Sequence, residues 1–437
     1  MQAAWAQTAG AHFETADGTR VRVVYPGIAR GSAGPDFKDA VVALSGAGEV
    51  HGDVELHLHS EDWRRHGHHL DHAYDGVVLH VVGGPSRESV IALACGWEAP
   101  TVSMHGQVRV ARREGLPCRR RRGGHEDAAL DALARLGVSR LLQRAAGIAG
   151  EMTCERPWVV LARRIARALG YSANAGAATE LAALLMSAGA PPLHELDQDE
   201  RCALMLGMAG LLPSQRRRAG VPVSGEMPHW EACWRSLGSA MEPLDSRLWR
   251  VSGLYPNNSP VRRVVALAAL WPGLPHLAAS LCADEDGGLE RPRTRAAGLE
   301  RYCRVAGDAF WRVHYDFGLR TRESDLVGGS KAREIVVNAL LPYAAAAAMV
   351  SGDAARLLEV VRFLRCYPRA APNAVTRHMR RQLGLSPGAG GAVEEQGMLH
   401  LFRRCCSRGL CGSCPLGGAW HPAAAVAESA GRGACSE

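Results

Sequence analysis

Acidic and imidazole side chains alternate along residues 52–59. Alternate residues of a β-strand project from the same face, so one face would carry Asp53, Glu55, His57 and His59. The opposite face would lie against a core and carry Val54, Leu56 and Leu58. Neighbouring ionisable groups on a buried face are costly unless a cation binds them. The pattern fits either a solvated sheet face or a metal-binding cleft, and we favour the cleft.

A hairpin would bring a further carboxylate to this face. The segments on either side of a two-residue loop, Gly46–Ala47, have the pattern of two strands, and the loop suits a turn with positive φ at its first central position. This register places Asp36 opposite His57, with Glu55 within side-chain reach. A loop one residue longer would turn Asp36 to the other face. In the predicted register, Asp36 and Glu55 hold Mg²⁺ or Mn²⁺ through oxygen, with His57 beside the ion.

An acidic residue after a proline on one strand, followed by an acidic residue on its partner, resembles the PD-(D/E)xK nuclease superfamily over roughly residues 20–95. The resemblance implies a restriction-endonuclease-like sheet, metal binding by Asp36 and Glu55, and cleavage of phosphodiester bonds. His57 stands where that superfamily has lysine, so it would orient or deprotonate the attacking water. Lys38, on the same face as Asp36, is an alternative for the lysine.

Longer motifs occur along most of the chain: Tyr25-Pro26-Gly27, Gly34-Pro35-Asp36-Phe37, Asp62-Trp63-x-x-His66-Gly67-His68-His69, Leu254-Tyr255-Pro256-Asn257-Asn258 and Cys411-x-x-Cys414-Pro415. Together they are similar to an uncharacterised bacterial family, domain of unknown function 2851. This similarity implies no established activity, so the function has to be argued from the residues.

Histidines are concentrated in the same region: eight of the 18 fall between His51 and His80. Neutral imidazole is a common metal ligand and an acid or base near neutral pH. We expect His66, His68 and His69 to cap and solvate a helix over residues 61–67. His80 lies in an apolar run that is typical of a buried strand, where it would be either a satisfied core group or part of a site.

A basic run follows this region, with seven arginines in fourteen residues: Arg109, Arg112, Arg113, Arg119, Arg120, Arg121 and Arg122. Such runs are often solvated loops. Next to a metal-binding domain, and in a chain of formal net charge +7, the run would also suit a phosphate backbone. We therefore expect all of them except Arg109 to contact nucleic acid.

Cysteines near the C-terminus form a second candidate metal site. Cys406, Cys411 and Cys414 have the spacing C-x₄-C-x₂-C, and Pro415 follows. Three thiolates on a tight loop suit Zn²⁺ or an iron–sulfur cluster. Cys118 is the first choice for a fourth ligand, ahead of Cys405, His400 and Cys366. The Cys-Pro ending and the resemblance to a superfamily that includes iron–sulfur nucleases favour the cluster over zinc, and free thiols are the alternative.

The organisation of the chain predicts an α+β protein. Short strand-like segments fill residues 10–110, and helical spacing of three and four begins at Asp127. We expect a restriction-endonuclease-like mixed-sheet domain over residues 1–125, a mainly helical domain over 126–395 and a cysteine-rich segment over 396–437.

Composition agrees with a soluble protein. Hydrophobic residues make up 47% of the 437 residues and charged residues 22%. The first residues lack the pattern of a signal peptide, and no apolar run approaches the roughly 20 residues of a membrane span. With 13 cysteines and no export signal, we expect a reducing cytoplasmic location and no membrane contact.

These observations predict a cytoplasmic, metal-dependent nuclease-like phosphodiesterase that acts on nucleic acid. A non-catalytic nucleic-acid-binding or assembly protein that retains the fold is the alternative. A metallo-hydrolase that uses the histidines on another substrate is a third reading.

Overall fold

The computed structural model describes residues 1–31, 34–105, 116–119, 126–187, 192–238, 241–254, 256–282 and 292–416. The chain forms two compact units: the first comprises residues 1–137, 372–390 and 394–437, and the second 138–371 and 391–393. The chain therefore leaves the first unit within the long helix α3 (Glu126–Met152) and returns to it after residue 371.

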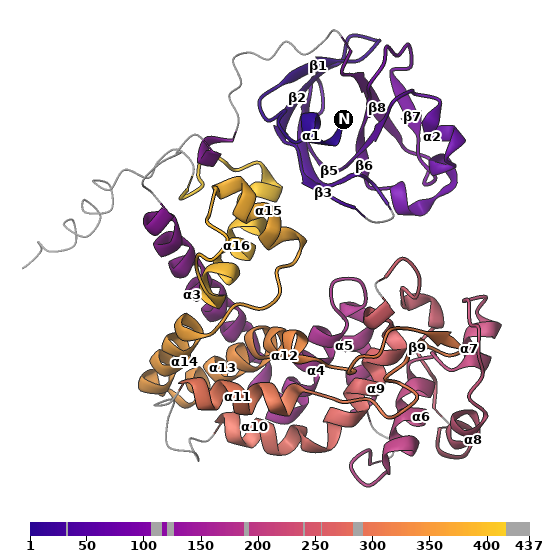
Figure 1. Ribbon diagram of the computed structural model, residues 1–437, viewed down its shortest axis with the longest axis vertical. Helices are drawn as coiled ribbons and strands as arrows, with labels where there is room; N and C mark the ends of the chain where they lie inside the picture. The colour runs from indigo at the N-terminus through magenta and orange to yellow at the C-terminus, as the bar shows by residue number, and fades with distance from the viewer. Residues whose placement is uncertain are drawn as a thin grey trace, which may run out of the picture. The chain divides into compact units, whose positions relative to one another are not determined.

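A mixed sheet of eight strands forms the body of the first unit (Figure 1). The strands are β1 (His12–Glu14), β2 (Arg20–Tyr25), β3 (Ile28–Ala29), β4 (Phe37–Leu44), β5 (Gly48–His57), β6 (Val77–Val82), β7 (Val90–Ala92) and β8 (Glu98–Ser103). Their order is β1-β2-β4-β5-β6-β8-β7, with β3 on β4. β6 is parallel to both β5 and β8, and the other pairs are antiparallel. The sheet curls until Thr15 pairs with Val102 on β8.

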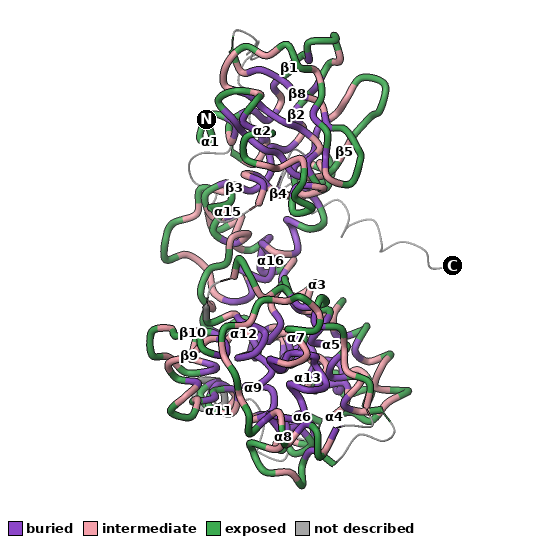
Figure 2. Tube along the Cα trace, turned by 90° about the vertical axis from the view of Figure 1, so that its right-hand side faces the viewer, coloured by how far each residue is buried: buried purple, intermediate pink, exposed green. Residues whose placement is uncertain are grey.

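The inside of the curve is an apolar core. Along β2, residues alternate between exposed and largely buried positions, so Val21 and Val23 face inwards. The short helix α1 (Gln2–Trp5) lies within the curve (Figure 1) and inserts Trp5, which is fully buried. The indole N–H of Trp5 donates to the carbonyl of Pro26 at 3.0 Å. Figure 2 shows the buried strand residues in purple.

A second apolar cluster joins the sheet to the C-terminal helices of the same unit. Tyr25 and Val41 pack there with residues of α3, α15 (Ala374–Leu383) and α16 (Ala392–Arg404). The hydroxyl of Tyr25 lies 2.6 Å from Nε2 of His378 on α15.

The β4–β5 hairpin does not have the predicted register. Leu44 pairs with Gly48, so the loop has three residues and not two. That change alone would turn Asp36 to the other face. A bulge, where Asp39 has φ 58°, shifts the register again, and Phe37 pairs with Val54. Together the two one-residue shifts return Asp36 to its predicted face of the sheet but move it two residues along β5. Asp36 therefore lies beside Glu55 and not opposite His57.

The second unit is mainly helical, which confirms the predicted α+β class with a mixed sheet followed by helices. Its helices are α4 (Pro157–Leu169), α5 (Ala175–Leu184), α6 (Gln198–Met208), α7 (Pro213–Arg218), α8 (Pro228–Leu237), α9 (Pro260–Leu270), α10 (Leu274–Cys282), α11 (Pro292–Cys303), α12 (Gly329–Ile335), α13 (Leu341–Ser351) and α14 (Ala354–Cys366). A small two-stranded sheet consists of β9 (His314–Asp316) and β10 (Leu319–Arg320). Residues 260–282 and 329–351 are long and apolar enough to span a membrane, but both are mostly buried, as core helices are.

Candidate metal centre

Three histidines converge at the carboxyl end of β5. The strand ends at His57, and the chain continues into the single-turn helix α2 (Asp62–Arg65). Gly67 then adopts φ 75°, a left-handed conformation that glycine tolerates best. This turn carries His66 and His68 back to His57, and suitable nitrogens of the three rings all lie within 4.8 Å of one another.

The carboxylate of Glu55 extends this group. Its Oε1 lies 3.7 Å from Nε2 of His57 and 3.6 Å from Nε2 of His68. Nε2 of His57 lies 3.2 Å from Nδ1 of His66. Ligands of one tetrahedral zinc are about 3.4 Å apart, because Zn–N bonds are about 2.1 Å long. The three imidazoles can therefore be drawn together around one ion, and the carboxylate of Glu55 lies beside two of them.

A second row of groups holds the ring of His57. Its Nδ1 lies 3.0 Å from Nε2 of His80, which is fully buried on β6, and Nδ1 of His80 lies 3.2 Å from the hydroxyl of Thr101 on β8. When Nδ1 of each ring carries the proton, His57 donates a hydrogen bond to His80, and His80 donates one to Thr101. Nε2 of His57 then has no proton, and its lone pair faces His66. Metal-binding histidines are commonly oriented by such a hydrogen bond from the other ring nitrogen.

Aromatic rings enclose the cluster on another side. The ring of His68 stacks on Tyr74 with centroids 3.8 Å apart. Trp63, which is almost fully buried, meets His57 edge-on at 6.4 Å and donates its indole N–H to the carbonyl of Ala92. These contacts restrict the rotamers of two of the three histidines.

Burial sets the protonation of the cluster. It lowers the pKa of His57 to about 4 and that of His80 to about 3, so both rings are neutral at pH 7. Burial also raises the pKa of Glu55 to about 7, against a hydrogen bond from the backbone of Asp36 that lowers it. A carboxyl that titrates near neutral pH beside neutral imidazoles is suited to bind a cation or to accept a proton.

Asp36 lies on the other side of the Glu55 carboxyl. Its backbone N–H donates to Oε2 of Glu55 at 2.9 Å. Its own Oδ2 accepts from the N–H of Leu56 at 3.2 Å, and its Oδ1 accepts from the side chain of Gln2 at 2.6 Å. The structure thus brings the predicted Asp36, Glu55 and His57 together. Asp36 has protein donors on both oxygens and acts as a positioning residue for Glu55.

Lys38, the alternative for the lysine, forms an ion pair with Asp53, and its charge also acts to lower the pKa of Glu55. Leu58 was expected in a core but is 66% exposed, because β5 ends one residue earlier.

His66 and His68 were expected to cap and solvate a helix; His66 does follow α2 as its C-cap residue and is exposed, but the two rings also belong to the cluster. The helix is only four residues long, and both rings lie against His57. Two histidines that flank a glycine, shortly after an acidic strand, were the signal that could have indicated this cluster.

Other predicted site residues lie elsewhere. Of the arginines expected to contact nucleic acid, Arg119 is described and exposed, whereas Arg112, Arg113, Arg120, Arg121 and Arg122 lie outside the described residues. The cysteines Cys118, Cys406, Cys411 and Cys414 gather in the second apolar cluster of the first unit and are not part of the histidine cluster.

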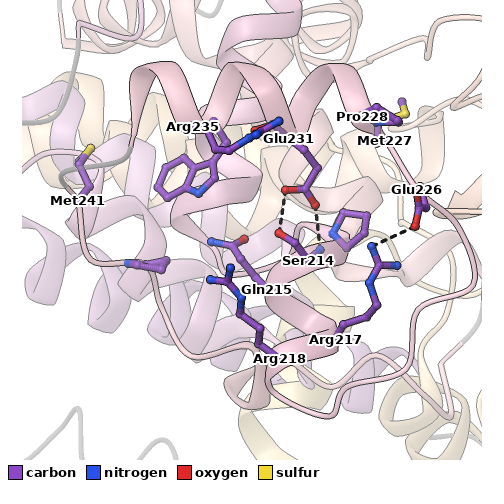
Figure 3. Close-up of a pocket in the computed structure, with 13 residues that line it drawn as sticks. Ser214, Gln215, Arg217, Arg218, Glu226, Met227, Pro228, Glu231, Arg235 and Met241 are labelled. Carbon is purple, nitrogen blue, oxygen red and sulfur yellow. Dashed lines mark hydrogen bonds and ion pairs between the residues drawn. The ribbon is translucent and has the colours of Figure 1, made fainter.

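A cavity of about 600 Å³ lies in the second unit, between α7 and α8 (Figure 3). Glu231 accepts hydrogen bonds there from the backbone and the hydroxyl of Ser214, and Arg217 pairs with Glu226 at 3.3 Å. The lining contains neither histidine nor cysteine. Because these polar groups already satisfy one another, the histidine cluster is the stronger candidate for chemistry.

Comparison with known protein families shows to which family the chain belongs. A model for proteins of unknown function (DUF2851) matches residues 1–371. The chain belongs to this family. The match includes the whole histidine cluster and ends before the cysteines at 405–414, although the motif Cys411–Pro415 was also read as similar to the family. No curated protein and no solved structure matches the chain, so the resemblance to PD-(D/E)xK nucleases stays a hypothesis.

Proposed function

We propose that the first unit is a metal-dependent hydrolase that cleaves phosphodiester bonds of nucleic acid. One observation carries the proposal: Glu55, a buried carboxyl whose pKa is raised to about 7, lies against His57 and His68, two of three converging imidazoles. Burying an ionisable carboxyl in this way lowers the stability of the folded protein, and such groups are typical of active sites.

The donor atoms favour a particular class of ion. His57, His66 and His68 would supply three nitrogens, which suit Zn²⁺ or Mn²⁺ better than Mg²⁺. Such an ion lowers the pKa of a bound water so that it becomes a nucleophile near neutral pH. From Asp36 and Glu55 we expected Mg²⁺ or Mn²⁺; the nitrogens of the three histidines favour Mn²⁺ or Zn²⁺ over Mg²⁺.

The residues of the chain have separate roles in this proposal. Glu55 accepts the proton of the attacking water through Oε1, and Asp36 holds its Oε2. His80 and Thr101 fix the ring of His57. Support for a nucleic-acid substrate comes from the net charge of +7 and the arginine run.

The test is an assay on single- and double-stranded DNA and RNA after chelation and reloading with Zn²⁺, Mn²⁺ or Mg²⁺. We expect Glu55→Gln and His66→Ala to lower cleavage at least about 100-fold. His72→Ala is the matched control, since His72 lies in a nearby turn and pairs with Asp75 on the surface, and it should retain full activity. Cleavage that survives both site variants would overturn the proposal. Tight binding without cleavage by any loaded form would favour a non-catalytic nucleic-acid-binding protein.

The three nitrogen donors also support a second candidate, a metallo-hydrolase that acts on another bond. Small chromogenic substrates separate the two: a nuclease hydrolyses a phosphodiester, whereas an esterase-type enzyme hydrolyses a carboxylic ester. Metal-dependent hydrolysis of the ester alone, lost in Glu55→Gln, would keep the metal centre and replace the substrate class.

A further inference from the structure

A group of thiols lies in the first unit, in the apolar cluster that joins the sheet to α15 and α16. Cys405, Cys406 and Cys414 are buried, Cys118 and Cys411 are half-buried, and none of them forms a disulfide. Their place in the interior and their number set them apart from the exposed cysteines Cys95, Cys154, Cys282 and Cys366.

Local backbone geometry presents the C-terminal thiols from one tight loop. Cys406 begins a 3₁₀ turn that ends at Arg408, and the N–H of Leu410 donates to the carbonyl of Cys405 at 3.0 Å. Gly409 has φ 67°, and a Cβ at this position would lie 2.9 Å from Cγ1 of Val24 on β2. The loop therefore requires glycine and packs directly on the sheet.

Gln382 on α15 connects this loop to a distant segment. Its side-chain amide donates to Sγ of Cys118 at 3.4 Å and to Sγ of Cys406 at 3.7 Å. Because the two sulfurs share a donor, they lie at most about 7 Å apart, so both can be ligands of one metal centre. Hydrogen bonds to the sulfurs are also one of the ways in which proteins tune such clusters.

The spacing distinguishes between the candidate metals. Sulfurs on one tetrahedral zinc lie about 3.8 Å apart, since each Zn–S bond is about 2.3 Å. Among the described residues, three thiols do not come within 4.8 Å of one another, whereas the three histidines do. A four-iron cluster holds its thiolates further apart, at roughly 6–7 Å, and this wider arrangement does not need three thiols within 4.8 Å of one another.

We propose that Cys118, Cys406, Cys411 and Cys414 bind a [4Fe–4S] cluster, with Gln382 as a hydrogen-bond donor to two of the ligands. The cluster links the turn that carries Arg119 to the loop after α16. It is independent of the hydrolase proposal, because it shares no residue with the histidine site.

Iron content and colour of the full-length protein test the proposal directly. Protein purified without oxygen from iron-replete cells should be brown and contain about four iron and about four sulfide per chain. Cys406→Ser and Cys414→Ser should each lower the iron content several-fold. Cys95→Ser and Cys366→Ser, at exposed thiols, should leave it unchanged.

Two further variants define the ligands and the donor. Cys118→Ser should lower the iron content, whereas Cys405→Ser should not, and the reverse result would overturn the assignment of Cys118. Gln382→Leu should retain the iron but change the reduction potential of the cluster, because it removes hydrogen bonds to two sulfurs. Colourless wild-type protein that carries one zinc per chain, or that contains neither zinc nor iron, would overturn the proposal. These readouts need no hydrolase activity, so the two proposals fail separately.

Discussion

At the scale of single residues, the two oxygens of Glu55 have different surroundings. Oε2 accepts a hydrogen bond from the backbone of Asp36, while Oε1 faces His57 and His68. The carboxyl is therefore fixed on one side and open to a cation or a proton on the other. Because burial opposes the ionisation of Glu55, the charged carboxylate lowers the stability of the metal-free protein. A bound cation would offset this loss.

The pH dependence of stability should reveal this loss. The pKa of Glu55 is raised from 4.5 in the unfolded chain to about 7 in the fold. The folded protein therefore binds the proton more tightly, and its stability falls as the pH rises from 4.5 through 7. Without metal, Glu55→Gln should raise the free energy of unfolding by about 1–3 kcal/mol at pH 8 and by almost nothing at pH 4.5.

Urea unfolding in the presence of a chelator measures this difference at both pH values. Asp75→Asn, at a partly exposed carboxylate paired with His72, is the control and should not stabilise at pH 8. A Glu55→Gln variant that is less stable than the wild type at pH 8 would contradict the prediction.

At the scale of elements, the bulge in β4 keeps Asp36 on the side of Glu55. It compensates for the three-residue loop of the hairpin, and Asp39 adopts φ 58° to form it. Aspartate and asparagine tolerate this left-handed conformation better than other residues with a Cβ, and β-branched residues tolerate it poorly.

We therefore expect Asp39→Val to destabilise the protein by about 1–2 kcal/mol, whereas Asp39→Asn and Asp39→Gly should be within about 0.5 kcal/mol of the wild type or better. The side chain is exposed, so lost packing cannot cause the difference. Denaturant unfolding of the three variants is the measurement. Equal stability of the valine and glycine variants would show that the bulge relaxes without cost.

At the scale of the whole molecule, each unit has its own core. Trp5 fills the inside of the curled sheet, where Phe13 and Phe37 lie 6.0 and 6.5 Å from its ring. The second unit has its own buried residues, on the part of α3 after residue 137 and on helices such as α4, α9 and α13. A cavity in the sheet should therefore weaken the first unit alone.

Trp5→Ala should destabilise the first unit by about 3–5 kcal/mol, because it removes a large, fully buried side chain. Calorimetry should show a lower melting temperature for one transition and no change in the other. Trp97→Ala is the matched control, since Trp97 is 76% exposed, and it should leave both transitions in place. If both transitions shift together in Trp5→Ala, the units unfold as one and the prediction fails.

The sequence by itself determined the features that depend on local periodicity. The alternation of Asp53, Glu55 and His57 predicted a strand with one chemical face, and the apolar run around His80 predicted a buried strand; both strands are present as β5 and β6. The change to helical spacing near residue 127 also marks the start of α3 within a residue. These patterns are visible because a strand repeats every two residues and a helix about every 3.6.

Only the tertiary structure decided which side chains meet. The loop length and the bulge set the partner of Asp36, and a single positive φ at Gly67 carries His66 and His68 to the end of β5. Gln382 reaches the thiol of Cys118 across 264 residues of sequence. Such contacts depend on turns of one or two residues and on the packing of distant segments, and neither leaves a periodic signal in the chain.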